Sequence, residues 1–467
     1  MLMAIFCPDE LRIWSDGDWN CRSSEVSVTG FCQDTRRLGA GQMFVALKTG
    51  KRDGHDFLDA AKDRGASSAL VERWVESSDL PQLKVGDCGE AFLNIGREHR
   101  QRFKGTVIGI TGTCGKTSTK DALRLLLDPE VCHATSGNFN NLIGVPLTLL
   151  EIDAKRHCRA VIEAGINEVG EMTKLASAIA PDIAVVTMVG PGHLAGLKSV
   201  ETVAREKALL CERAGRDVVT VLPESCLQHE AFANLEGKRL VLRRGSPEQD
   251  PDEGTIIFDA STETNQTGNA ASLRLRRRGY PVASFSIPIL SPGMTANLAL
   301  ALATALEIGV ETEDARERLK LHRPSAMRGH QLDSGDRSYY VDCYNANPAS
   351  MADALSFFHR LENEKPRLYV IGGMEELGLE SEQLHRELGS SLPLRPEDRV
   401  LLIGDSAEAV GEGIGQSDQV EYFAAAEQAR EHVDSFSGAV FLKGSREHRL
   451  EILVPGFGED ESNEDKC

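Results

Sequence analysis

The sequence is poor in several features that would each point to a class of protein. Only 5% of its 467 residues are aromatic, and 52 Lys and Arg stand against 71 Asp and Glu, a formal net charge of −19. This acidic excess argues against broad binding to nucleic acid or to anionic membranes. No run of 18 uninterrupted apolar residues occurs, so we expect no membrane insertion.

Cysteine lacks a recognisable pattern, and no secretory signal is expected. The 11 cysteines are scattered without C-x-x-C pairs or metal-ligand spacing, which favours reduced thiols and disfavours zinc. The start, MLMAIFCPDELRIWSDGDWN, has no basic segment of the kind that opens a signal peptide. We therefore expect a cytoplasmic protein, with an acidic, disordered tail over residues 459–467.

The rest of the chain alternates short β-branched runs with helix-length segments, which predicts an α/β protein of three domains. Residues 1–103 predict a mixed α/β domain, with a helix-like stretch over 53–74. Residues 104–324 predict a central domain on a parallel sheet, with a small antiparallel side-sheet at 272–289. Residues 325–458 repeat the strand–helix pattern and predict a C-terminal Rossmann-like α/β domain.

The segment VIGITGTCGKTSTK opens the central domain and carries the strongest chemical signal. A strand that ends in a Gly-rich loop and feeds a helix directs backbone N–H groups at an anion. The spacing departs from the strict P-loop pattern because Ile110 replaces the first glycine. A plain Gly-rich turn is the alternative, but the context favours a nucleoside triphosphate and a P-loop ATPase-like domain. The expected phosphate contacts are Gly112, Thr113, Cys114, Gly115, Lys116, Thr117 and Ser118.

Other polar residues gather after predicted strands, but none is decisive alone. Glu163 ends a strand, where it could hold Mg²⁺ or be a solvated loop acid. By themselves, His193 more often fits a structural histidine and Lys207 a solvated helix lysine. Two Asn-rich loops suit neutral polar or peptide-like groups, although turn chemistry explains part of their composition. These loops contain Asn138, Asn140, Asn141, Asn345 and Asn347.

The order of several segments resembles the Mur ligases. They are GITGTCGKTS, TSGNFNNLIGVPLTLL, EAGINEVGEM, GHL followed by AREKALL, VDCYNANPASM, GGMEELG and LKGSR, with DTRRLGAGQMFVALKTGKRDGHDF in the first domain. YNANP and NFNNLIGVPLTLL are typical of the branch that adds D-alanyl-D-alanine, and the D-N-P-R motif of another branch is absent. The resemblance covers nearly the whole chain except the tail.

This resemblance implies an ATP- and Mg²⁺-dependent amide ligase of peptidoglycan synthesis, working as a monomer. It would join D-alanyl-D-alanine to UDP-N-acetylmuramoyl-tripeptide through an acyl phosphate. The implied catalytic residues are Lys116, Glu163, His193 and Lys207. The implied metal ligands are Thr117, Glu163, His193 and Lys207 as a carbamate. Further ATP contacts would be Asn297, Arg328 and Asp342. The implied substrate residues are Thr35, Arg36, Asn138, Asn140, Asn141, Asn345, Asn347, Glu376, His385, Lys443 and Ser445.

Two departures and three alternatives accompany this interpretation. Gly373 stands where the branch usually has Asp, and Met294 stands where a His commonly precedes the Asn corresponding to Asn297. Oxidation of Cys114 is predicted to block ATP. The alternatives are another ATP-dependent amide ligase, such as the related folylpolyglutamate synthases, a P-loop switch protein, and a non-catalytic remnant. The remnant is disfavoured because Lys116, Glu163, His193 and Lys207 are all present. The switch is disfavoured because Asp-x-x-Gly and Asn-Lys-x-Asp motifs are missing. Hinges are expected near residues 103 and 324.

Overall fold

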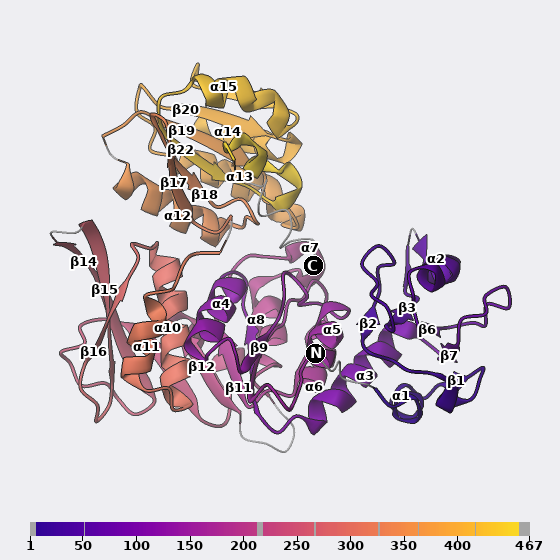
Figure 1. Ribbon diagram of the computed structural model, residues 1–467. Coiled ribbons are helices and arrows are strands. Elements are labelled where there is room, and N and C mark those ends of the chain that lie inside the picture. Colours follow the sequence, from indigo (N-terminus) through magenta and orange to yellow (C-terminus); the bar gives the residue numbers. More distant parts are fainter. Residues whose placement is uncertain are drawn as a thin grey trace.

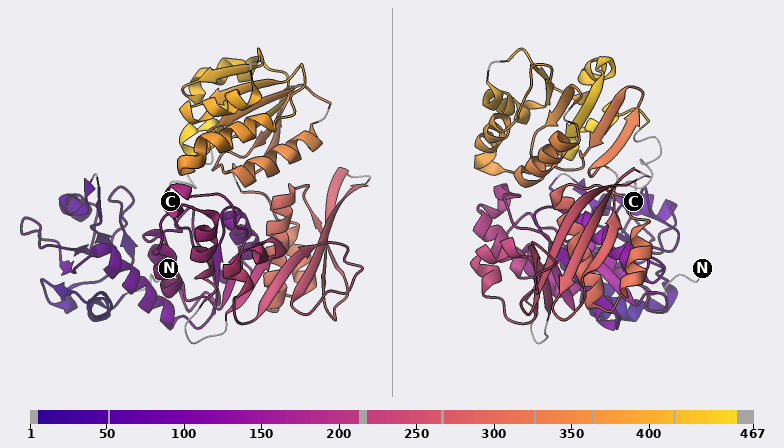
Figure 2. Two further views of the ribbon diagram at one scale, coloured as in Figure 1. Left: turned by 180° about the vertical axis from the view of Figure 1, so that it is seen from behind. Right: turned by 90° about the vertical axis from the view of Figure 1, so that its left-hand side faces the viewer.

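The computed structural model describes residues 6–456 apart from 51, 213–217, 266–267, 326, 363 and 416; the predicted tail at 459–467 lies outside the described residues. Three sheets, each with helices packed on it, divide the chain (Figure 1). The prediction of a three-domain α/β protein is therefore confirmed. The central domain lies between the other two, and the C-terminal domain sits over one of its edges (Figures 1 and 2).

The N-terminal domain is built on a five-stranded sheet in the order β1-β7-β6-β3-β2. All neighbouring strands are parallel except β1 and β7. The strands are β1 (Asp18–Trp19), β2 (Phe31–Cys32), β3 (Met43–Val45), β6 (Ser68–Val71) and β7 (Gln82–Lys84), with a separate hairpin of β4 (Lys48–Thr49) and β5 (Arg52–Asp53). The helices are α1 (Pro8–Ser15), α2 (Leu58–Asp63) and α3 (Cys88–Arg102).

The expected helix-like stretch over 53–74 is wrong in its second half. Helix α2 ends at Asp63, and Gly65 adopts a left-handed conformation with φ of 88°, which is typical of a residue just after a helix. The chain then forms β6, whose four residues are all buried. A short buried apolar run fits a parallel strand as well as it fits a helix.

The central domain carries a nine-stranded sheet in the order β16-β15-β14-β13-β12-β11-β8-β10-β9. The strands from β9 to β14 run parallel, whereas β15 and β16 are antiparallel additions at one end. The expected antiparallel strands are therefore present, but they extend the main sheet instead of forming a separate one. The strands are β8 (Thr106–Thr111), β9 (Cys132–Ala134), β10 (Arg159–Glu163), β11 (Ile183–Val186), β12 (Val219–Pro223), β13 (Arg239–Arg244), β14 (Thr255–Asn265), β15 (Gly268–Arg277) and β16 (Ala283–Ile287).

Helices cover both faces of this sheet because alternate strand residues point to opposite faces. Ile108 and Ile110 of β8 belong to one buried cluster with α4 and α10, whereas Val107 belongs to another with α5 and α6. The helices are α4 (Lys116–Leu126), α5 (Gly144–Leu150), α6 (Glu171–Ile179), α7 (Leu194–Leu197), α8 (Val200–Ala208), α9 (Glu230–Ala233), α10 (Pro292–Glu307) and α11 (Thr312–Leu319). Among the described residues, no helix has both the length and the apolar character needed to cross a membrane.

The C-terminal domain has a six-stranded sheet in the order β17-β18-β22-β19-β20-β21, parallel except for β17. Its strands are β17 (His330–Ser334), β18 (Arg337–Val341), β19 (Arg367–Gly372), β20 (Arg399–Ile403), β21 (Val420–Phe423) and β22 (Gly438–Lys443). Its helices are α12 (Pro348–Leu361), α13 (Ser381–Ser390), α14 (Glu408–Ile414) and α15 (Arg430–Ser435). The carboxyl ends of its parallel strands supply the loops that face the central domain.

The N-terminal domain joins the central domain through apolar packing along α3. Leu93 and Phe103 belong to the same buried cluster as residues of α5 and α6. The Arg100 guanidinium donates to the carbonyls of Ile179 and Ala180, each at 2.9 Å. These contacts fix α3 to the central domain.

Candidate active site

The loop predicted to bind phosphate, called the phosphate loop below, runs from Gly112 to Gly115, between β8 and α4. Gly112 has φ of 151° and Gly115 has φ of 84°. A Cβ atom on Gly112 would lie 1.8 Å from Thr187 Oγ1, and one on Gly115 would lie 2.5 Å from the Asn297 amide. Both positions therefore require glycine, for backbone conformation and for space. The first turn of α4 begins directly after them, which directs its unpaired N–H groups at the loop.

Two lysines converge on one carbonyl of this loop. Lys116 Nζ donates to Gly112 O at 2.9 Å, and Lys207 Nζ of α8 donates to the same oxygen at 3.0 Å. Burial lowers the pKa of the Lys116 ammonium. Burial, reinforced by the positive charge of Lys116, lowers the pKa of Lys207 well below its usual value. Lys207 is thus a buried amine with a weakened hold on its proton.

Glu163 ends β10 beside the first turn of α4. Its side chain is 1% exposed, and its carboxylate accepts from Thr117 Oγ1 at 3.1 and 3.3 Å. Asn140 Nδ2 donates to the same carboxylate at 2.8 Å. The Glu163 backbone N–H donates to Thr135 Oγ1 at 2.9 Å. The Glu163 carboxylate and the Thr117 hydroxyl thus place hard oxygen atoms next to each other at the phosphate loop.

A cavity of about 560 Å³ lies between this loop and the C-terminal domain. It brings together side chains that are far apart in the sequence. Gly112 and Lys207 lie outside its lining, with Lys207 bonded to the Gly112 carbonyl. The sequence-predicted residues that line it are Thr113, Cys114, Gly115, Lys116, Thr117, Ser118, Asn138, Asn140, Asn141, Glu163, His193, Asn297, Arg328, Asp342, Asn345, Asn347, Glu376, Lys443 and Ser445.

Three predicted substrate residues do not line this cavity. Thr35 and Arg36 belong to the N-terminal domain, where Arg36 pairs with Asp34 at 2.5 Å. His385 is a correction to the predicted site, since it is buried and both of its ring nitrogens are bonded inside the C-terminal domain. Its Nε2 accepts from the Met374 backbone N–H at 2.8 Å, and its Nδ1 lies 2.6 Å from Ser381 O. His385 therefore holds the backbone of the Met374 loop.

The C-terminal wall of the cavity is polar and charged. Lys443 is 1% exposed and pairs with Asp342 at 2.6 Å. The Arg328 guanidinium lies 3.9 Å from the centre of the Tyr344 ring, where it presents a planar cation. Asn347 caps α12 by accepting from the Ser350 backbone N–H at 2.9 Å. Part of the Asn-rich loop thus serves helix capping, as turn chemistry predicts.

His193 and Glu376 meet across the two domains. His193 Nδ1 lies 2.5 Å from Glu376 Oε2. The close approach of His193 lowers the pKa of the Glu376 carboxyl, so this carboxylate carries its charge. Glu376 is therefore engaged with a central-domain histidine in this arrangement, which differs from its expected contact with substrate.

Sequence reasoning missed two acids on this wall. Asp353 of α12 accepts from Ser291 Oγ at 2.5 Å and from the Gly293 backbone N–H at 2.8 Å, at the start of α10. Glu375 accepts from Ser406 Oγ at 2.8 Å and lies 3.2 Å from His448 Nε2. Asp353 is a helix residue within an otherwise ordinary pattern, so no local signal marked it. Glu375 adjoins Glu376 in GGMEELG, where the motif gave a signal without separating the two.

The structure shows what surrounds Gly373, Met294 and Cys114. A Cβ atom on Gly373 would lie 1.8 Å from Ser406 Oγ, so the serine hydroxyl fills the space of a larger side chain. Met294 Sδ would lie 2.6 Å from a Cβ on Gly329, close to the chain crossing between domains. Burial raises the pKa of the Cys114 thiol to about 11. A raised pKa lowers the fraction of reactive thiolate, so oxidation of Cys114 is expected to be slow.

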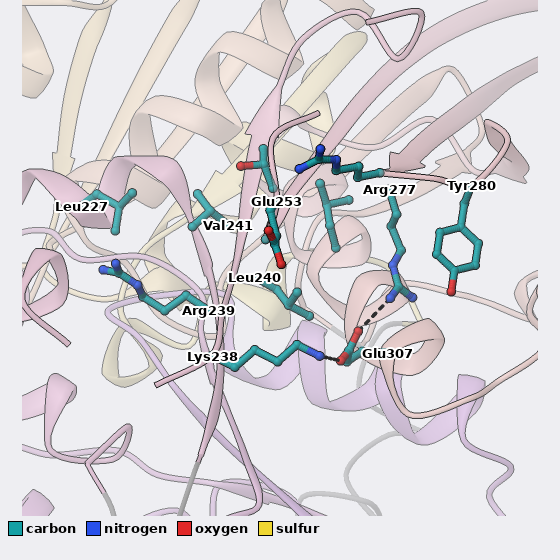
Figure 3. A pocket seen from close by; sticks show the side chains of 13 residues that line it. Leu227, Lys238, Arg239, Leu240, Val241, Glu253, Arg277, Tyr280 and Glu307 are labelled. Atoms are coloured by element: carbon teal, nitrogen blue, oxygen red, sulfur yellow. Dashed lines mark hydrogen bonds and ion pairs between the residues drawn. The ribbon is translucent and has the colours of Figure 1, made fainter. Parts of the chain in front are cut away.

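A second hollow, of about 830 Å³, lies at the start of β13 and β14 (Figure 3). Strand β8 runs parallel to these strands and ends at the phosphate loop. The hollow therefore lies at the amino ends of the strands, on the side of the sheet away from that loop. Two of the cations that line it, Lys238 and Arg277, are already paired with Glu307. Ligands of open α/β sheets bind at the carboxyl ends of strands, which favours the cavity at the phosphate loop.

A phosphate loop that faces a charged second α/β domain across a polar cavity defines a nucleotide-dependent enzyme with three domains. The Mur ligase middle domain matches residues 110–305, and the Mur ligase, glutamate ligase domain matches residues 327–446. The chain belongs to the Mur ligase family, and it is therefore a ligase.

Relatives extend the likeness over most of the chain. The UDP-N-acetylmuramoyl-tripeptide–D-alanyl-D-alanine ligase of Bacillus subtilis (strain 168) is 30% identical over 451 residues, covering 93% of this chain and 94% of its own. The enzyme of the same name from Escherichia coli (strain K12) is 30% identical over 403 residues, covering 85% and 86%. A crystal structure of MurF from Acinetobacter baumannii matches with a TM-score of 0.83 at 26% identity, covering 97% and 98%.

Proposed function

We propose that this protein is an ATP-dependent ligase that joins D-alanyl-D-alanine to UDP-N-acetylmuramoyl-tripeptide. The names of relatives at 30% identity over most of both chains support this assignment. The observation that carries it is the shared cavity, which is lined by Lys116 and Glu163 of the central domain and by Lys443 and Glu376 of the C-terminal domain. A ligase needs such a space, because phosphoryl transfer and amide formation must occur beside one another.

The reaction begins when the terminal carboxylate of the tripeptide attacks the γ-phosphorus of ATP. The bond to ADP breaks and an acyl phosphate forms. The amine of D-alanyl-D-alanine then attacks the acyl carbon, loses a proton and expels phosphate. Lys116 and the backbone N–H groups after Gly112 stabilise the charge on the transferred phosphoryl group. The two facing domains exclude water that would hydrolyse the acyl phosphate.

The donor set near the loop fits Mg²⁺. Thr117 and Glu163 supply hard oxygen atoms about a hydrogen bond apart, at 3.1 Å, which Mg²⁺ prefers. When bound, Mg²⁺ offsets the repulsion between the substrate carboxylate and the ATP phosphates. His193 would add a nitrogen ligand. Lys207 as an ammonium is no metal ligand, but its lowered pKa supports addition of the neutral amine to CO₂, which releases a proton and leaves a carbamate with ligand oxygens.

The remaining predicted residues take their places around this chemistry. Asn297, Arg328 and Asp342 are proposed for the nucleotide, and Asn138 and Asn141 for the muramoyl-tripeptide. Thr35 and Arg36 of the N-terminal domain are proposed to bind the uridine-nucleotide end of the substrate, since the substrate is long enough to extend there from the cavity. Asn345, Lys443 and Ser445 are proposed for the dipeptide. We propose that the protein works as a monomer in the cytoplasm.

Phosphate release from ATP tests this proposal. The purified protein is incubated with Mg²⁺ and UDP-N-acetylmuramoyl-tripeptide, with D-alanyl-D-alanine present or withheld. Release that needs both partners, together with a pentapeptide product by mass, is the expected result. Release that needs the tripeptide but is indifferent to the dipeptide would show a different acceptor. Release that depends on neither would refute the ligase assignment.

A further inference from the structure

Both residues of the His193–Glu376 contact have an unusual backbone conformation. His193 precedes α7 with φ of 53°, and Glu376 lies before the short 3₁₀ turn Gly378–Glu380 with φ of 63°. Non-glycine residues adopt this left-handed conformation at a cost of about 1–3 kcal/mol, and they persist where the surroundings hold them. Two such residues from different domains touch each other here.

Backbone contacts hold the two loops together around this pair. The Ala195 backbone N–H donates to the Glu376 carbonyl at 3.1 Å. A Cβ atom on Gly378, whose φ is 63°, would lie 3.2 Å from Ala195 Cα. The backbone of the Glu376 loop is thus docked on α7, so the carboxylate is delivered to His193 by the fold as well as by its own rotamer.

The neighbouring acid, Glu375, makes its contacts differently from Glu376. Glu375 is satisfied within its own domain by Ser406 and His448. Glu376 reaches across the domain boundary, where its Oε2 lies 2.5 Å from His193 Nδ1. That nitrogen is buried and, among the described residues, forms no well-aligned hydrogen bond. Glu375 therefore makes its contacts inside the C-terminal domain, whereas Glu376 makes its contact between the domains.

We propose that Glu376 is a positioning residue that fixes His193 as a metal ligand. The negative charge of a carboxylate beside Nδ1 favours the proton on that nitrogen, which leaves the lone pair of Nε2 for a metal. Because the carboxylate comes from the C-terminal domain, the ligand nitrogen of His193 is set only while the two domains are docked. This inference rests on the proposed function, in which His193 binds the metal.

Binding of Mn²⁺ in place of Mg²⁺ tests this proposal without turnover. Full-length protein with a non-hydrolysable ATP analogue is titrated with Mn²⁺ and followed by electron paramagnetic resonance. Loss of such a carboxylate partner typically costs about 10–100-fold in metal affinity, so Glu376→Ala is expected to bind Mn²⁺ at least about tenfold more weakly. Glu376→Gln retains an acceptor oxygen and is expected to recover most of that loss. Glu380→Ala, at an exposed acid four residues on, is the matched control.

His193→Ala separates the possible failures. It is expected to lose as much affinity as Glu376→Ala, and the double variant is expected to be no weaker than either alone. Wild-type affinity in Glu376→Ala, or equal losses in Glu376→Gln and Glu376→Ala, would overturn the positioning role. Unchanged affinity in His193→Ala would instead refute His193 as a ligand, and with it that part of the proposed function.

A spectroscopic measurement on the metal-free protein gives an independent answer. Histidine labelled with ¹⁵N reports which ring nitrogen carries the proton, and His193→Gln identifies the signal. We expect the Nδ1–H form in the wild type and in Glu380→Ala, with a shift toward the Nε2–H form in Glu376→Ala. An Nε2–H form in the wild type, or no change in Glu376→Ala, would overturn the proposal.

Discussion

At the residue scale, Glu163 is the side chain on which the proposed phosphate site most directly depends. Its carboxylate accepts from Thr117 and Asn140 while almost wholly buried. Glu163→Gln keeps the shape and an acceptor oxygen but removes the charge. We expect kcat to fall about 10²–10³-fold, as for loss of one preorganised electrostatic group, with the melting temperature nearly unchanged. Steady-state kinetics check this, with the exposed Glu168→Gln as control; a kcat near the wild type would contradict it.

Gly373 and Ser406 form a second pair whose sizes are matched. A Cβ atom at 373 would lie 1.8 Å from Ser406 Oγ and 2.7 Å from Ser406 Cβ. Gly373→Asp, the residue usual in the branch that adds D-alanyl-D-alanine, is therefore expected to lower the free energy of unfolding by about 1–3 kcal/mol. Gly373→Asp combined with Ser406→Gly should recover most of that loss in urea denaturation. Additive effects of the two changes would show that they do not share this space.

Single residues also show what the sequence alone could predict. The glycines and Lys116 of the loop follow from local pattern, because a strand, a tight turn and a helix are contiguous. Lys207 lies 95 positions from Gly112, and only the resemblance linked them before the fold did. The resemblance implied His385, whereas its burial and its bonds to Met374 and Ser381 depend on tertiary packing.

At the element scale, α12 and α10 meet through Asp353. This carboxylate accepts from Ser291 and Gly293 at the amino end of α10, where the helix dipole favours negative charge. Burial nevertheless raises its pKa above the usual value, since it outweighs those hydrogen bonds and the attraction of Lys443; the negative charge of Asp342 raises it further. The ionised form is thus less favoured in the folded than in the unfolded chain.

A raised pKa in the folded state gives a definite sign to the pH dependence. The contribution of Asp353 to stability is fully present below its unfolded pKa and is lost as the pH rises through its folded pKa. Asp353→Asn keeps an acceptor without charge, so we expect it to melt higher than the wild type at neutral pH. The difference should shrink as the pH falls into the acidic range. Calorimetry across pH checks this; a difference that grows in acid would contradict it.

Helices and strands were predicted correctly where residue composition and hydrophobic periodicity indicated the same element, and were missed where the two disagreed. The buried β-branched runs of β8, β10, β11 and β12 stand out against their polar flanks. The stretch around β6 reads equally as helix or strand, and only Gly65 marks the break. The continuity of β15 and β16 with the main sheet depends on the pairing of β14 with β15, which lies in no local pattern.

At the scale of the whole molecule, the two domain junctions are physically unlike. The junction near residue 103 is apolar, with Phe103 in the central core and Arg100 bonded to two carbonyls of the central domain. The other junction is crossed between Ser325, which donates to Asp121 of α4 at 2.5 Å, and Met327, which packs in the C-terminal core. Of the two expected hinges, we therefore favour the second, at 325–329, where Met327 and Gly329 have φ of 56° and 69°.

This asymmetry predicts which domain moves. The polar pairs Glu376–His193 and Asp353–Ser291 hold the C-terminal domain on the central one, and small polar interfaces of this kind permit relative domain motion. Removing both pairs with Glu376→Ala and Asp353→Ala is expected to increase the radius of gyration in small-angle X-ray scattering and to speed protease cleavage near 325–329. Arg102→Ala, which removes an exposed pair with Glu10 in the N-terminal domain, should change neither. An unchanged radius in the double variant would mean that packing outside these two pairs holds the domains, and that closure does not depend on the cavity's own acids.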